Sequence, residues 1–138
     1  MIDASVALRW YIEDERNANA DAIHERVVED PESFAVPELF GYEVFSVLFR
    51  VHPDPLKTFR EGILPLLSSG ILRYPLTEGI AHRAATFAEQ GLTGYDSFYV
   101  ALAEELNALW LTFDSKAHTL VQDHHLSVDL GVHLPEEW

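Results

Sequence analysis

The stretch LTGYDSFYVALAEELNALWLTFDSKAH, residues 92–118, decides the fold. It predicts a helix over residues 93–107, followed by a short apolar strand over residues 108–113. A second helix is predicted over residues 115–124. A strand enclosed by two helices is typical of α/β proteins, in which parallel strands are covered by helices.

The rest of the chain shows the same alternation of helices and strands. A very short strand is expected around Ile2, and the predicted helix over residues 56–67 is irregular because Gly62 and Pro65 lie inside it. We therefore expect an α/β fold with a parallel β-sheet flanked by helices on both faces, formed by a single domain of residues 1–138. The other predicted helices cover residues 5–12, 17–30, 37–51 and 77–90, and the other predicted strands cover residues 34–37, 71–75 and 126–132.

The composition excludes several classes of protein. No apolar run approaches the length of a membrane span, and no secretory signal is visible, so we expect a cytoplasmic protein with no membrane association. The absence of cysteine excludes disulfides and thiolate metal sites. A net charge of −14, from 23 acidic and 9 basic residues, argues against broad nonspecific binding to nucleic acid. That acidity suits cations or a basic protein partner, and it equally suits plain solubility.

Four carboxylates fall where a parallel sheet would gather them. Asp3 and Asp114 end predicted strands, Asp96 lies in the first turn of its helix, and Glu43 lies about two turns into the helix after residues 34–37. In parallel sheets the functional residues lie beyond the carboxyl ends of the strands. Carboxylates that share a small volume repel each other, and hard divalent cations such as Mg²⁺ or Mn²⁺ relieve that repulsion.

Each carboxylate also has a plainer interpretation. Asp3 and Asp114 precede predicted helices and could cap them, and Thr93 and Asp96 match the capping-box pattern S/T-x-x-D/E. Glu43 lies within an apolar helix, where an unpaired charge is costly, so its alternative is partial exposure or an ion pair with a residue such as Arg50. The four carboxylates together are a more specific indication of a metal site than any one of them alone.

The segments DASVALRW, PELFGYEVFSVL, LTGYDSFYVALAEEL and WLTFDSKAH resemble the PIN domains of VapC-type toxins. The likeness covers essentially the whole chain. It implies an α/β/α sandwich and the activity of a small metal-dependent ribonuclease that cleaves structured RNA, often tRNA or rRNA. It also implies a homodimer that is silenced by a VapB-type antitoxin.

Carried over by position, the resemblance implies an acidic quartet that binds one or two Mg²⁺ or Mn²⁺ ions, and a metal-activated water that attacks the phosphodiester. Ser5 and Thr112 match positions where the family often places a small hydroxyl residue, and they would support the quartet. Ser46 departs from the family, which commonly has asparagine there. The quartet consists of Asp3, Glu43, Asp96 and Asp114.

The strong acidity is awkward for an enzyme that acts on RNA, so RNA would have to approach through a local basic patch. The cations closest in sequence to the quartet are Arg9, Arg50 and Lys116, which are candidate RNA contacts. Two other functions stay open at this point. One is a PIN-like fold used only for binding, and the other is an acidic receiver-like signalling domain that accepts phosphate on an aspartate.

Overall fold

The computed structural model describes residues 1–136. Its strands are short, and they form parallel pairs. β1 (Ala35–Pro37) pairs with β2 (Leu72–Tyr74), and β3 (Trp110–Thr112) pairs with β4 (Ser127–Asp129). All residues of β1 and β3 are buried, which agrees with their apolar sequences and with helices on both sides.

The first residues of the chain join the two pairs of strands. Ile2 forms a parallel bridge with Leu111 of β3, and the Asp3 N–H donates to the Leu111 carbonyl at 3.0 Å. On the other side, the Ile2 N–H donates to the Ala35 carbonyl of β1 at 3.1 Å. The order across the sheet is therefore β2, β1, residues 1–3, β3 and β4. The expected first strand is confirmed, although it is reduced to a single bridge.

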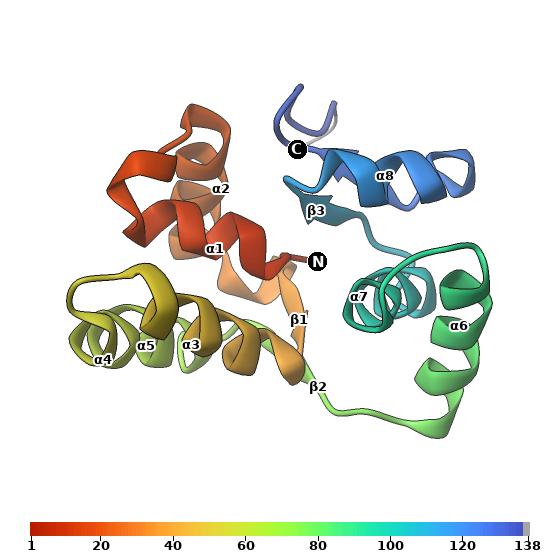
Figure 1. The fold of residues 1–138 in the computed structure, drawn as a ribbon, viewed down its shortest axis with the longest axis horizontal. Helices are drawn as coiled ribbons and strands as arrows, with labels where there is room; N and C mark the ends of the chain where they lie inside the picture. The colour runs from red at the N-terminus through yellow and green to blue at the C-terminus, as the bar shows by residue number, and fades with distance from the viewer. Residues whose placement is uncertain (137–138) are drawn as a thin grey trace.

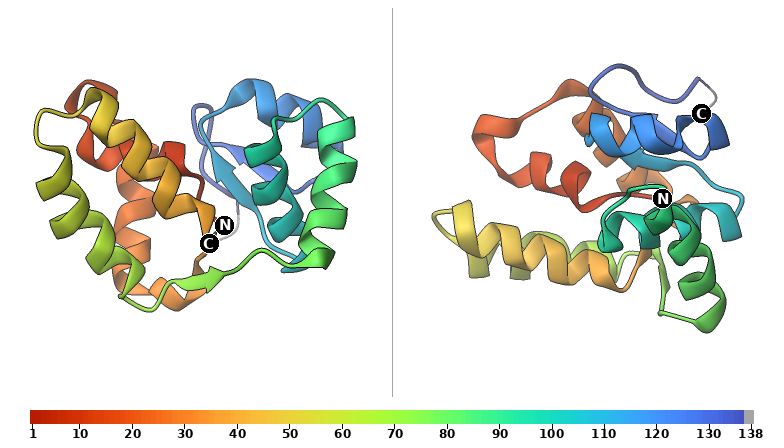
Figure 2. Two further views of the ribbon diagram at one scale, coloured as in Figure 1. Left: turned by 60° about the horizontal axis from the view of Figure 1, so that its bottom comes forward. Right: turned by 45° about the vertical axis from the view of Figure 1, so that its right-hand side comes forward.

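Helices cover the strands from both sides. Figures 1 and 2 show α1 to α5 on one side of the strands and α6 to α8 on the other. No helix within residues 1–136 has the length and apolar character needed to cross a membrane. The helices are α1 (Ala4–Tyr11), α2 (Ala18–Glu29), α3 (Leu39–Val51), α4 (Pro55–Thr58), α5 (Leu64–Leu67), α6 (Glu78–Glu89), α7 (Gly94–Glu105) and α8 (Ser115–Val121).

The irregular helix expected over residues 56–67 contains a π-helical turn, Phe59–Ile63, between α4 and α5. Gly62 lies in this turn, and a Cβ atom there would lie 2.6 Å from the ring of Tyr11. The glycine therefore allows α1 and this turn to approach closely. Within residues 1–136, short 3₁₀ turns also occur at Glu13–Glu15, Pro31–Ser33 and Gln122–His124.

Candidate active site at the carboxyl edge of the sheet

Asp3 is a buried carboxylate held by two hydroxyl groups. Its side chain is 5% exposed, and its Oδ2 accepts hydrogen bonds from Ser5 Oγ at 2.6 Å and from Thr112 Oγ1 at 2.8 Å. Burial raises the pKa of Asp3 from 3.8 to about 6, although the two hydroxyl groups lower it. The side chain does not cap α1, so the capping interpretation is wrong for Asp3.

The same two hydroxyl groups join the start of α1 to the end of β3. Ser5 Oγ accepts from the Phe113 N–H at 3.1 Å, and Thr112 Oγ1 accepts from the Asp114 N–H at 3.0 Å. Each hydroxyl therefore donates to Asp3 and accepts from the segment that carries Asp114. This arrangement fixes the backbone of the two strand ends relative to each other.

Asp114 is exposed and begins α8. Its Oδ1 accepts from the Ala117 N–H at 2.9 Å, so the capping interpretation is confirmed for this residue. A cap occupies one carboxylate oxygen and leaves the charge in place.

Within residues 1–136, Glu43 forms no ion pair with a cation. Its side chain is half-buried in α3, and its Oε1 is buried without a hydrogen-bond partner among residues 1–136. Burial and the carboxylates of Asp3 and Asp96 raise the pKa of Glu43 from 4.5 to about 7, and the nearby hydroxyl of Tyr99 lowers it. The alternative prediction of an ion pair between Glu43 and Arg50 is wrong, because the ion pairs in the described chain include neither of these two residues. They are Arg16–Asp21 and Arg83–Glu104.

Asp96 lies in the first turn of α7 and completes the group. The cap of α7 is Thr93, whose Oγ1 accepts from the Asp96 N–H at 3.2 Å. Burial raises the pKa of Asp96, the Thr93 hydroxyl lowers it, and repulsion from Asp114 raises it further. The four carboxylates are thus linked electrostatically, since Asp96 and Asp3 raise the pKa of Glu43, Asp96 raises that of Asp3, and Asp114 raises that of Asp96.

The group fits a hard divalent cation in its chemistry, although its side chains are not yet gathered around a common point. Within residues 1–136, His, Asp and Glu side chains form no group of three or more that is arranged to hold a metal ion. The donors present are carboxylate oxygens, which Mg²⁺ and Mn²⁺ prefer, and Glu43 Oε1 is a buried acceptor without a partner in the part of the chain that the structure describes. Binding an ion would require the side chains to draw together against their mutual repulsion.

The candidate cations lie around this group. Arg9 lies 4.0 Å over the ring of Phe113 and donates to the Ser5 carbonyl at 3.0 Å. Arg50 lines a pocket of about 480 Å³ together with Glu43, and Lys116 is exposed in the first turn of α8. Aromatic residues that could stack on RNA bases are mostly inaccessible, since Trp10, Tyr11 and Tyr99 belong to the interior or its margin. Tyr95 is 65% exposed.

Asp129 was not identified from the sequence as a functional candidate. Asp129 ends β4 and is buried, and its carboxylate accepts from Ser115 Oγ at 2.5 Å and from the Gly131 N–H at 2.8 Å. It thereby holds the first residue of α8, directly after Asp114. The available signal was a carboxylate within the short predicted strand 126–132, which in the structure ends at Asp129. Tyr99 is fully buried, and its hydroxyl also has no hydrogen-bond partner within the described chain.

Comparison with known proteins identifies the class. The chain belongs to the PIN domain family, which it matches over residues 1–121. It is also similar to ribonuclease VapC3 of Pyrobaculum aerophilum, with 27% identity over 120 residues that cover 83% of this chain and 88% of that protein. The resemblance to VapC-type PIN domains and the expected α/β fold are therefore confirmed, and a receiver-like signalling domain is excluded.

Proposed function

We propose that this protein is the ribonuclease toxin of a VapBC-type pair, acting in the cytoplasm on structured RNA such as tRNA or rRNA. Asp3, Glu43, Asp96 and Asp114 hold one or two Mg²⁺ or Mn²⁺ ions. The observation that carries the proposal is the group of mutually repelling carboxylates in a member of the PIN family, together with a buried Glu43 Oε1 that has no hydrogen-bond partner among residues 1–136.

The roles of the residues follow from their contacts. Bound ions supply Lewis-acid activation of water and stabilise negative charge on the leaving oxygen. Ser5 and Thr112 orient the Asp3 carboxylate, and they also fix the backbone N–H groups of residues 113 and 114. This support limits rotation of the ligands, which is the usual role of residues that contact metal ligands.

RNA and the protein partners require different surfaces, a basic one for RNA phosphates and an apolar one for the antitoxin and the second copy of the chain. Arg9, Arg50 and Lys116 contact RNA phosphates around the acidic group. A VapB-type antitoxin and a second copy of this chain cover exposed apolar residues of α3, where Phe45 and Phe49 stack with ring centroids 4.3 Å apart. Contiguous exposed apolar side chains of this kind mark protein interfaces.

A PIN domain used only for binding is the second candidate function. It is favoured by one observation, namely that the carboxylates within residues 1–136 form no ready set of three ligands. The two candidates differ in what they require, because a nuclease needs saturable ion binding and a binding module does not.

The test compares Asp96→Asn with the wild type in two measurements. Mn²⁺ binding is measured by calorimetry on antitoxin-free protein, and cleavage is measured on purified tRNA and rRNA. We expect a fall in cleavage of more than about 100-fold, because even partners that only support metal ligands cost 10- to 100-fold when removed. The matched control is Asp123→Asn, an exposed aspartate after α8. Equal cleavage by Asp96→Asn and wild type would refute the assignment, and the absence of both Mn²⁺ binding and cleavage in the wild type would favour the binding module.

A further inference from the structure

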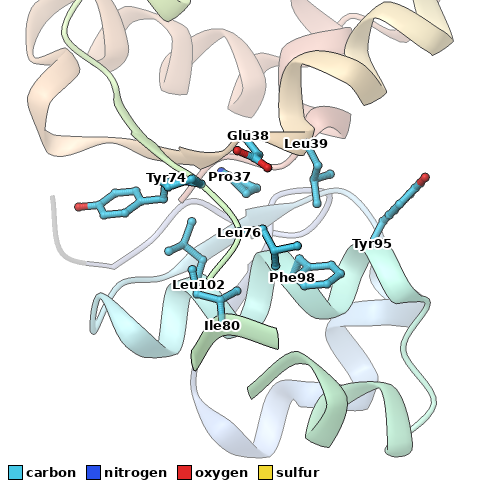
Figure 3. A pocket seen from close by; sticks show the side chains of 10 residues that line it. Pro37, Glu38, Leu39, Tyr74, Leu76, Ile80, Tyr95, Phe98 and Leu102 are labelled. Carbon is cyan, nitrogen blue, oxygen red and sulfur yellow. The ribbon is translucent and has the colours of Figure 1, made fainter. Parts of the chain in front are cut away.

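An apolar pocket of about 200 Å³ lies beyond the carboxyl ends of β1 and β2 (Figure 3). Tyr95, Phe98 and Leu102 contribute one face of α7 to it, at helical spacing. Figure 3 shows Tyr74 and Tyr95 toward opposite ends of the pocket, with Glu38 beside Leu39. The lining residues are Pro37, Glu38, Leu39, Tyr74, Pro75, Leu76, Ile80, Tyr95, Phe98 and Leu102.

The pocket adjoins the candidate active site. Leu39 and Tyr95 line both this pocket and the neighbouring pocket that contains Glu43. A nucleotide chain bound at the carboxylates would therefore have the apolar pocket within reach of an adjacent base. Tyr95 lies next to Asp96 in the first turn of α7, so the residue that lines both pockets is adjacent in sequence to one of the carboxylates.

The lining selects a neutral, flat group. Aromatic and aliphatic side chains make up the walls, and Glu38 is the one charged residue among those that line the pocket. A phosphate would meet no cation there and would be repelled by Glu38. A nucleobase can stack on aromatic rings without any charge, and its N–H groups can donate to the carboxylate.

We infer that this pocket is a base-binding subsite that receives a nucleobase of the RNA next to the cleaved phosphodiester, and that it prefers guanine. The inference rests on the proposed nuclease function. A carboxylate only accepts hydrogen bonds, and guanine presents two adjacent donors on its Watson–Crick edge, N1–H and N2–H. Adenine and cytosine present one amino group there, and uracil presents carbonyl oxygens on both sides of its single N–H.

The negative net charge of the protein explains why a base-binding subsite would contribute to RNA binding. Nine basic residues against 23 acidic ones leave few cations for phosphate contacts, so phosphate binding is weaker here than in a basic nuclease. Base stacking does not depend on cations and is sequence-tolerant. The apolar pocket supplies binding that the acidic surface cannot, and Glu38 at its rim adds the preference for one base.

The test uses RNA oligonucleotides with a randomised region, cleaved by the wild type in Mn²⁺ and sequenced at the new ends. We expect guanine to be enriched at one position beside the cut in the wild type. Glu38→Gln should reduce that enrichment at least about fivefold, because an amide both donates and accepts. Tyr95→Ala should weaken binding of the preferred RNA about tenfold, in line with the loss of one stacked base. The control is Glu78→Gln, an exposed glutamate that begins α6 outside the pocket.

The outcomes separate the subsite from the nuclease assignment. Cleavage without a guanine preference, or with a preference that Glu38→Gln leaves unchanged, overturns the subsite while the nuclease assignment stands. A wild type that neither binds Mn²⁺ nor cleaves RNA overturns both. If Tyr95→Ala weakens binding of the antitoxin and leaves RNA binding unchanged, the pocket receives a protein side chain and the base-binding inference is wrong.

Discussion

Replacing Asp3 with asparagine should stabilise the metal-free protein at pH 8. Burial raises the pKa of Asp3 from 3.8 to about 6 even after two hydroxyl groups donate to it. At about 1.4 kcal/mol per pKa unit, this shift corresponds to a cost of roughly 3 kcal/mol for keeping the carboxylate ionised in the folded state. Asparagine keeps an acceptor for Ser5 and Thr112 and carries no charge.

The sign of the pH dependence follows from proton binding. Between pH 4 and pH 6 the folded state binds more protons at Asp3 than the unfolded chain does, so the free energy of unfolding falls as the pH rises through this window. The stabilising contribution of protonated Asp3 is fully present below pH 3.8 and is lost above about pH 6. The advantage of Asp3→Asn should therefore be smaller at pH 4.5 than at neutral pH and approach roughly 3 kcal/mol at pH 8.

The assay is urea unfolding in the presence of a chelator, followed through the fluorescence of the buried residues Trp10 and Trp110. Asp54→Asn is the control, because this aspartate is exposed and does not cap α4. Mn²⁺ should stabilise the wild type more than Asp3→Asn, since ligand binding to the folded state adds about 2.7 kcal/mol at 100 times the Kd. A variant that is less stable than the wild type at pH 8 would show that the hydrogen bonds to the carboxylate outweigh its burial, and would refute the reasoning.

Three further substitutions test other parts of the site. Tyr99→Phe removes a buried hydroxyl that has no hydrogen-bond partner among residues 1–136, so the metal-free fold should keep its stability in urea. The pKa of Glu43 measured by NMR should rise further from about 7, because the nearby Tyr99 hydroxyl lowers it, and an unchanged pKa would show that this hydroxyl does not act on Glu43. Asp129→Ala should destabilise the protein by about 1–3 kcal/mol in urea unfolding, because Ser115 in the first turn of α8 loses its hydrogen bond to the Asp129 carboxylate. The same variant should bind Mn²⁺ more weakly in calorimetry, and an unchanged Mn²⁺ affinity would show that Asp129 contributes to folding alone. Gly62→Ala should lower stability by about 1–3 kcal/mol through a clash with the Tyr11 ring, and Gly94→Ala, where a Cβ meets nothing within 4 Å, should not.

The sequence alone was sufficient for the fold class, because the alternation of helices and strands leaves few arrangements. A parallel sheet also brings the ends of its strands to one edge, so the positions of Asp3 and Asp114 in sequence indicated that they would lie near each other. Local capping signals were correct at Thr93 and Asp114, because these caps depend only on neighbouring residues, but not at Asp3, whose carboxylate is held by Ser5 and Thr112 instead. The irregularity expected near Gly62 was also a local property.

The tertiary structure decided everything that depends on contacts between distant parts of the chain. Ser5 and Thr112 meet at one oxygen of Asp3 across more than a hundred residues, and no local pattern specifies that distance. Whether Glu43 pairs with a cation, whether Asp129 is buried, and how closely the carboxylates approach each other are likewise set by the packing of separate elements. The sequence determines which groups can bind an ion or a base, and the fold determines which of them are close enough to act together, because both burial and electrostatic repulsion depend on distances in space.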